Sequence, residues 1–238
     1  MKNILFTFTG LLLLINVPVF AQKRLIFSVY SGSGISMFAG PGSVESSNYY
    51  ISDVSAIPNS VAEHYGQNSF TNFLAGIQSR IQFKNNWMGL LNTQYEFTGG
   101  RLNIDKVVSR TGIRDTTGKY KKWFHFISVN PEIGRILYQQ KIKLILNVGI
   151  DYAFKLEEGA EYEFTKKDGS KSVISSTGGP PGNNDIRITA GVLVFIKRWS
   201  LNFNYKHGVR NYNEGSNDKV FSRLFHLRLM FAFLDKEI

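Results

Sequence analysis

Apolar and polar residues alternate along eight stretches of this chain. In the clearest stretch, residues 141–156, every second position holds Ile142, Leu144, Leu146, Val148, Ile150, Tyr152, Phe154 or Leu156. The positions between them are mostly polar, and Ile145 is the one apolar residue among them. A period of two residues predicts a β-strand with one apolar and one polar face.

The other seven stretches are separated by connections of alternating length. They run over about residues 24–38, 69–83, 87–97, 122–137, 185–196, 199–210 and 220–233. Short turns at 84–86, 138–140 and 197–198 alternate with long connections, which include 99–121 and 157–184. Outer-membrane barrels have short periplasmic turns and longer extracellular loops. The pattern therefore predicts an all-β fold, an eight-stranded antiparallel up-and-down transmembrane β-barrel with both termini in the periplasm.

Alternation alone does not say which face points inward. The polar face is rich in Gly, Ser, Asn and Gln and poor in Lys and Glu, which suits a narrow interior better than a solvated exterior. The apolar face is nearly free of charge; its exception, Arg135, lies near a turn, where a long side chain can reach the headgroups. Aromatic residues gather at the strand ends, as they do at membrane interfaces. These features favour lipid on the apolar face over the alternative, a soluble barrel with an apolar core.

The charged residues of the polar face form the predicted lumen network. Eight strands enclose a space that side chains can fill, and buried charges need partners. We therefore expect ion pairs and hydrogen bonds that plug the lumen; a conducting pore is the alternative. The residues are Arg80, Glu96, Glu132, Lys143, Asp151, Asp185, Arg187, Lys206 and Arg228.

The first residues have the features of an export signal. Lys2 precedes an apolar stretch from Ile4 to Phe20, and Val19-Phe20-Ala21 ends in a small residue. This pattern predicts a signal peptide over residues 1–21, cleaved before Gln22, and a single barrel domain over 22–238. A membrane anchor helix is the alternative. Because the chain has no cysteine, disulfides and thiolate metal sites are excluded.

The chain is basic, with a formal net charge of +10. Export makes nucleic acid an unsuitable partner, so anionic lipid and lipopolysaccharide phosphates are the expected counter-charges. The second long connection is the candidate contact, because Lys and Arg bind phosphate strongly; the alternative is a solvated basic rim. Its basic residues are Arg101, Lys106, Arg110, Arg114, Lys119, Lys121 and Lys122.

The third long connection contains a hairpin signal. The segment EYEFTKKDGSKSVIS, residues 161–175, has two alternating runs around Asp168-Gly169, a dipeptide favoured in tight hairpin turns. The strands over 141–156 and 185–196 would thus extend beyond the membrane as a flap whose exposed edge can pair with an incoming strand of a protein partner. A hairpin without a partner is the alternative.

Catalysis requires a nucleophile, a base and an orienting acid within reach of one another. His125 and Ser128 are three residues apart on one strand and so lie on opposite faces. His64 falls in the first long connection, His207 on the outer face, and His226 inward, where we expect a hydrogen bond. No histidine pair has metal-ligand spacing. We therefore expect no enzyme activity, no metal and no cofactor.

Three segments carry a family resemblance. They are the signal ending VFAQ, the first strand FSVYSGSGISMFAG and the last strand FHLRLMFAF. With them the chain resembles the small outer-membrane β-barrel proteins of OmpA/OmpX-type architecture, and PorT-like barrels most of all. The resemblance implies an outer-membrane location and insertion by the barrel-assembly machinery, read from Phe225, Leu227, Leu229, Phe231 and Phe233; five residues follow this signal here.

The expected function is a structural or surface-binding role carried by the extracellular loops of a monomer. Some PorT-like proteins assist a secretion system, which makes a secretion accessory the first alternative. A narrow solute channel and a lipid A-modifying enzyme are the others.

Overall fold

A computed structural model describes residues 22–51, 60–61, 64–83, 85–109, 112–114, 116–139, 141–178, 184–213 and 217–237. The predicted signal peptide, residues 1–21, lies outside these residues. Among the described residues, no helix is long and apolar enough to cross a membrane. The strands are β1 Gln22–Ala39, β2 Ser46–Tyr50, β3 Ser60–Val61, β4 Phe70–Phe83, β5 Trp87–Ser109, β6 Gly112–Arg114, β7 Thr117–Gln139, β8 Ile142–Thr165, β9 Lys171–Thr177, β10 Asp185–Ile196, β11 Trp199–Gly208 and β12 Phe221–Glu237.

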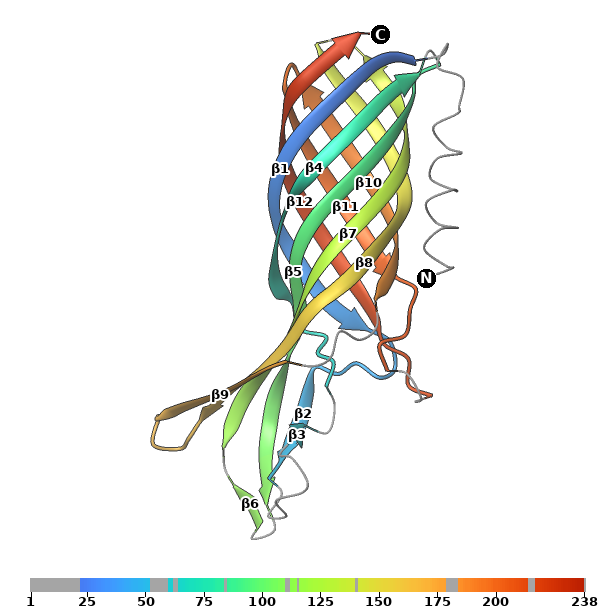
Figure 1. The fold of residues 1–238 in the computed structure, drawn as a ribbon. Coiled ribbons are helices and arrows are strands. Elements are labelled where there is room, and N and C mark those ends of the chain that lie inside the picture. The colour runs from blue at the N-terminus through green and yellow to red at the C-terminus, as the bar shows by residue number, and fades with distance from the viewer. Residues whose placement is uncertain are drawn as a thin grey trace.

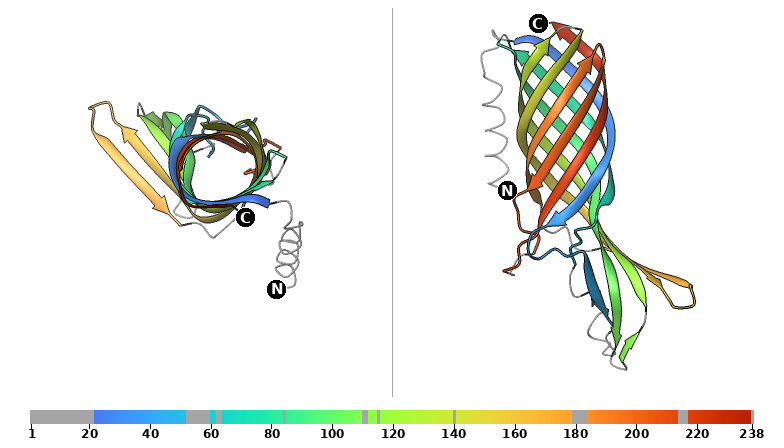
Figure 2. Two further views of the ribbon diagram at one scale, coloured as in Figure 1. Left: turned by 90° about the horizontal axis from the view of Figure 1, so that it is seen from above. Right: turned by 180° about the vertical axis from the view of Figure 1, so that it is seen from behind.

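Eight of these strands close into a barrel (Figure 1). Each pairs antiparallel with the next in the order β1, β4, β5, β7, β8, β10, β11 and β12, and β12 pairs with β1. Because neighbours in this ring are also consecutive predicted strands, the topology is up-and-down. The predicted fold class is confirmed, and a view along the axis shows the closed ring (Figure 2).

The two faces of the barrel have the polarity of a membrane protein. On β10, Ile188 is 57% exposed, whereas its neighbour Arg187 is completely buried. On the adjacent strand β8, Ile150 is 57% exposed and Asp151 is completely buried. A water-soluble barrel would have the opposite arrangement, because burying charge and exposing an apolar surface both cost free energy.

Short turns and aromatic side chains mark the end of the barrel where β1 begins and β12 ends. Asn86 and Lys197 occupy these turns with φ of 60° and 54°, in the left-handed region that tight hairpin turns require. At the same end Trp199 contacts Phe231 with ring centroids 5.0 Å apart, and Arg135 lies 5.6 Å from the ring of Trp87. Arg135 thus meets an aromatic ring at the boundary instead of standing alone among apolar side chains.

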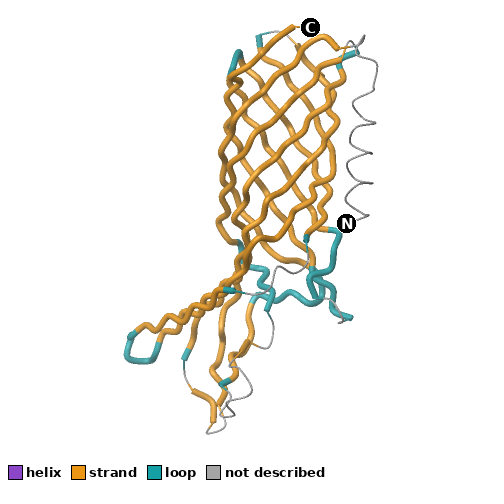
Figure 3. The backbone as a smooth tube through the Cα atoms, in the orientation of Figure 1, coloured by secondary structure: helices purple, strands orange, loops and turns teal. Residues whose placement is uncertain are grey.

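The long connections predicted at 99–121 and 157–184 are largely strands, and this is a correction. β5, β7 and β8 continue past the barrel without interruption (Figure 3). We call this extension the projecting sheet. It consists of β2, β3, β6 and β9, the part of β5 after Gly99, the part of β7 before Trp123 and the part of β8 after Glu157. It has its own apolar core, formed by Tyr49, Leu102, Ile104, Val107, Tyr120 and Phe164.

The last strand closes the barrel and continues beyond the predicted assembly signal. Phe225, Leu227, Leu229 and Phe233 are exposed on the outer face, and Phe231 is half-buried there. A bulge at Phe233 shifts the pairing with β1, where Phe27 faces Leu234 and Ser28 faces Ala232. The four residues after Phe233 therefore remain part of β12.

Candidate functional site: the lumen and the projecting sheet

The buried charges of the lumen centre on Arg187. Its Nε donates to Oδ2 of Asp185 at 2.6 Å, and Nη1 donates to Glu96 and, at 3.2 Å, to Oδ2 of Asp151. The ammonium of Lys206 donates to the same two carboxylates, at 2.9 Å to Glu96 and 2.8 Å to Asp151. Two cations from β10 and β11 thereby hold together three carboxylates from β5, β8 and β10.

Neutral side chains complete this cluster. The hydroxyls of Tyr212 and Ser222 donate to Oδ2 of Asp185 at 2.7 and 2.8 Å. The amide of Gln94 donates to Oε2 of Glu96 at 2.8 Å. Because each carboxylate has partners, the cost of burying its charge is offset locally.

A series of side-chain hydrogen bonds leads from Glu132 through Thr189 and Asn130 to neighbouring strands. Asn147 donates to Glu132 at 2.7 Å. From Asn130, further bonds lead through Asn92 to Gln78, at 3.1 and 2.7 Å. Sequence reasoning placed these Asn and Gln residues on the inner face but did not name them as members of the network.

Arg80 and Arg228 are buried against aromatic rings and not beside carboxylates. In the described part of the chain neither forms an ion pair. Arg80 lies 4.6 Å from the ring of Phe195 and donates to Ser28 at 2.6 Å. Arg228 lies 5.4 Å from the ring of Tyr30. A cation over a ring face is stabilised by the ring quadrupole, more strongly when water is excluded.

Two expectations for the inner face need correction. Lys143 is half-buried, not enclosed with the others, because it lies one residue after the start of β8 at the barrel rim. His226 is buried as expected, but among the described residues neither of its ring nitrogens has a hydrogen-bond partner. Its environment therefore differs from the expected one.

The remaining histidines are outside the lumen network. His125 lies on the outer face, with its ring 4.9 Å from Phe97 and 5.0 Å from Trp123, whereas Ser128 is completely buried inside. His207 contacts Tyr205 on the outer face. Within the described ranges, no group of three or more His, Asp or Glu residues could hold a metal ion.

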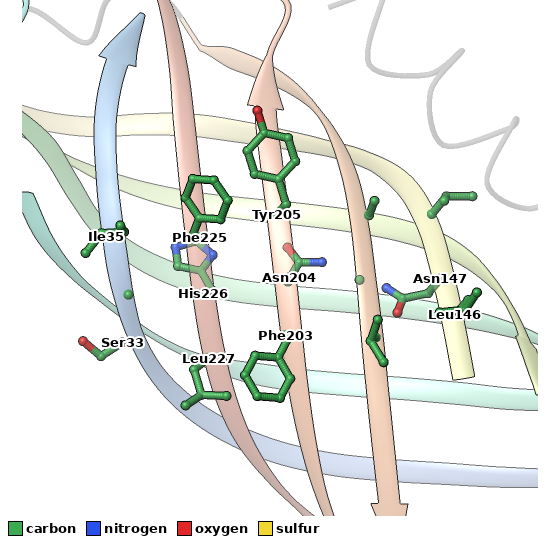
Figure 4. Close-up of a pocket in the computed structure, with 15 residues that line it drawn as sticks. Ser33, Ile35, Leu146, Asn147, Phe203, Asn204, Tyr205, Phe225, His226 and Leu227 are labelled. Carbon is green, nitrogen blue, oxygen red and sulfur yellow. The ribbon is translucent and has the colours of Figure 1, made fainter. Parts of the chain in front are cut away.

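A mainly apolar cavity of about 620 Å³ lies at the wall formed by β1, β8, β10, β11 and β12 (Figure 4). Phe203, Phe225 and Leu227 line it from outer positions, beside the small residues Gly34 and Ala190. Such a lining suits an acyl chain and offers no cluster of charged groups for chemistry.

The structure separates the seven basic residues of the predicted lipopolysaccharide contact. Lys121 forms an ion pair with Glu161, and Lys122 lies over the ring of Tyr65 at 4.6 Å. Lys106 is exposed on β5. Arg110 falls outside the described residues, and Arg114 belongs to β6, where only the backbone is described.

Two of the seven, Arg101 and Lys119, line one polar pocket. The pocket has a volume of about 330 Å³ and includes Asn68, Ser69 and Asn103. Arg101 is held in place by a bond from Nε to the carbonyl oxygen of Ser69 at 2.6 Å. Lys119 is exposed. The pocket thus combines two cations with two amide side chains.

The hairpin predicted around Asp168-Gly169 is present. β8 and β9 pair antiparallel, with Thr165 facing Lys171, and Gly169 has a φ of 80°. Hydrogen bonds from the hydroxyl and the backbone N–H of Ser170 lower the pKa of Asp168 in the turn. The flap consists of β9 and the end of β8, however, and not of an extended β10 as expected, because β10 begins only at Asp185.

These features define the class of the protein: a transmembrane β-barrel with a packed polar lumen and a sheet that projects from one end. No family model and no curated protein matches the sequence. Among solved structures, "Crystal structure of Neisserial surface protein A (NspA)" is similar, with a TM-score of 0.40 and 12% sequence identity over 87% of this chain and 97% of that chain. At this level the similarity adds no functional argument, so the class rests on the geometry of the chain itself.

Proposed function

We propose that the chain is an exported outer-membrane protein whose projecting sheet is extracellular and binds phosphate groups of lipopolysaccharide. The pocket of Arg101 and Lys119 is the observation that carries this proposal. Guanidinium and ammonium groups bind phosphate by charge-assisted hydrogen bonds. The role is one of surface binding, without catalysis.

The position of the pocket supports a headgroup ligand. Phe97 and Trp123 belong to the aromatic groups on the outer face, with ring centroids 6.0 Å apart. Arg101 follows Phe97 by four residues on β5, and Lys119 precedes Trp123 by four on β7. With strands that rise about 3.3 Å per residue and tilt by about 40°, the two cations lie roughly 10 Å beyond the aromatic belt. This is the depth of charged lipid headgroups.

The lumen favours binding at the surface over transport. Arg187, Lys206 and Arg228 are completely buried inside the barrel. Their side chains have no surface that water can reach, which supports a filled lumen over a channel.

Binding of purified lipopolysaccharide tests the proposal. In the Arg101→Gln, Lys119→Gln double variant we expect at least about a hundredfold loss of affinity, because two charge-assisted contacts of about 1.5–3 kcal/mol each are removed. Lys106→Gln is the matched control, since Lys106 is exposed on the same strand but does not line the pocket. Equal binding by the double variant and the control would reject the proposed site.

A further inference from the structure

The projecting sheet ends in an unpaired strand. Closing the barrel removes every edge within the ring, but in the described part of the chain β9 pairs with β8 alone. Its second side is therefore a row of backbone N–H and C=O groups without strand partners, along the seven residues from Lys171 to Thr177. Seen along the barrel axis, β9 lies on the side of the hairpin away from the barrel (Figure 2).

This edge lacks the usual protection against pairing. Natural edge strands are shielded by central charges, proline or bulges. β9 has neither proline nor an internal charge, since Lys171 stands at its first position. Val173 and Ile174 are 60% and 48% exposed, so apolar surface is available on both faces of the strand.

We propose that β9 pairs antiparallel with β9 of a second copy of this chain, so that two barrels in the same membrane form a two-fold dimer through their projecting sheets. This inference goes beyond the proposed binding of lipopolysaccharide and does not depend on it. It also departs from the monomer expected from the sequence.

The sequence of β9 is self-complementary about Ile174. In the symmetric register Ile174 faces its own copy, Val173 faces Ser175, Ser172 faces Ser176, and Lys171 faces Thr177. No like charges oppose each other, and like charges are what would penalise direct pairing. Each Lys171 already pairs with Glu163 of its own hairpin at 3.1 Å, so the interface gains no uncompensated charge.

The two isoleucines would extend an existing apolar row. Ile174 pairs with Tyr162 across the hairpin. Tyr162 in turn packs against Tyr49 and Tyr120, with ring centroids 5.2 and 4.8 Å apart. In the dimer, the row would run from Tyr162 through both copies of Ile174 to the second Tyr162, and cross-strand pairs of this kind stabilise sheets.

The orientation of the hairpin allows two upright barrels. The axial view shows β8 and β9 side by side with their broad faces toward the viewer (Figure 2). The two-fold axis of an antiparallel strand pair stands perpendicular to the sheet, hence close to the barrel axis. Both copies can therefore occupy one membrane with the same orientation, in an isologous contact. Seven residues make a small interface, typical of transient association, and confinement to one membrane raises the effective concentration.

Cysteine cross-linking of the full chain in membranes tests the dimer. Because the chain has no native cysteine, Ile174→Cys should form a disulfide-linked dimer under mild oxidation. Val209→Cys, exposed at a site away from β9, measures random collision. We expect Ile174→Cys to cross-link at least about ten times faster than Val209→Cys, as an oriented contact requires. Similar rates, or a link from Ile174→Cys to a different protein, would overturn the proposal.

The register is tested separately. Copies with Ser172→Cys mixed with copies with Ser176→Cys should cross-link with each other, because these positions face one another across the two-fold axis. Adding Ile174→Lys to both should abolish the cross-link, whereas Ile174→Val should preserve it. Retained heat-dependent gel mobility of Ile174→Lys shows that its barrel is folded. Persistence of the cross-link in folded Ile174→Lys copies would refute the register.

Discussion

At the scale of single residues, charges inside the barrel are balanced. Among the described residues, four cations and four carboxylates are buried there: Arg80, Arg187, Lys206 and Arg228 with Glu96, Glu132, Asp151 and Asp185. Removing one member of a buried pair costs more than the pair contributes, because the other charge remains uncompensated. Arg187, which bonds three carboxylates, is the member whose loss should cost most.

We expect Arg187→Ala to reduce the free energy of unfolding by about 3–5 kcal/mol, because Glu96, Asp151 and Asp185 lose a common partner. The measurement is the urea midpoint of the folded barrel in lipid. Lys121→Ala is the control, since it breaks the partly exposed pair with Glu161 and should cost less than about 1 kcal/mol. Equal losses in the two variants would mean that the lumen cluster is not a buried ion network.

At the scale of elements, sequence periodicity predicted the eight barrel strands but not their full length. β5 reaches Ser109 because Leu102 and Ile104 continue the alternation. Charged residues between the apolar positions, such as Arg101 on β5 and Lys119 on β7, gave these parts of the strands the composition of a loop. A sheet outside the membrane has a solvated face, so its strands carry charge where membrane strands carry Leu or Val. Composition therefore marked the membrane boundary and not the end of the strands.

The ion pairs inside the lumen could not be predicted from the sequence, for a different reason. Alternation predicts which side chains point inward, and for that it is enough to know whether the odd- or the even-numbered positions of each strand face the lumen. The contact between Arg187 and Glu96 joins residues 91 positions apart, and it depends on the register and tilt of several strands together. A shift of register by two residues leaves the same side chains pointing inward but changes the partner of each one.

The barrel should fold without the outer part of the projecting sheet. Asn103 and Lys119 face each other across β5 and β7, so replacing residues 104–118 with Asn-Gly leaves a two-residue hairpin between them. We expect this variant to keep the heat-dependent gel mobility of a folded barrel, because the lumen network and all eight ring pairings remain. Loss of that mobility would show that the barrel depends on the projecting sheet for folding.

At the scale of the whole molecule, two surfaces of opposite character meet at the barrel wall. The apolar outer face and the charged interior are separated by the thickness of one strand, as Ile188 and Arg187 show. That arrangement is stable with lipid outside and with charges of opposite sign balanced inside. The two proposed binding surfaces, the pocket of Arg101 and Lys119 and the edge of β9, both belong to the projecting sheet.

Spin labels along β10 test whether lipid covers the outer face of the barrel and the lumen is packed. In protein reconstituted into lipid vesicles, we expect labels at Ile188→Cys and Ala190→Cys to collide freely with oxygen and rarely with a water-soluble nickel chelate. Labels at Thr189→Cys and Leu193→Cys, whose native residues are completely buried, should be inaccessible to both. Absence of this alternation, or ready access of the nickel chelate to positions 188 and 190, would contradict a barrel with lipid outside and a packed polar lumen.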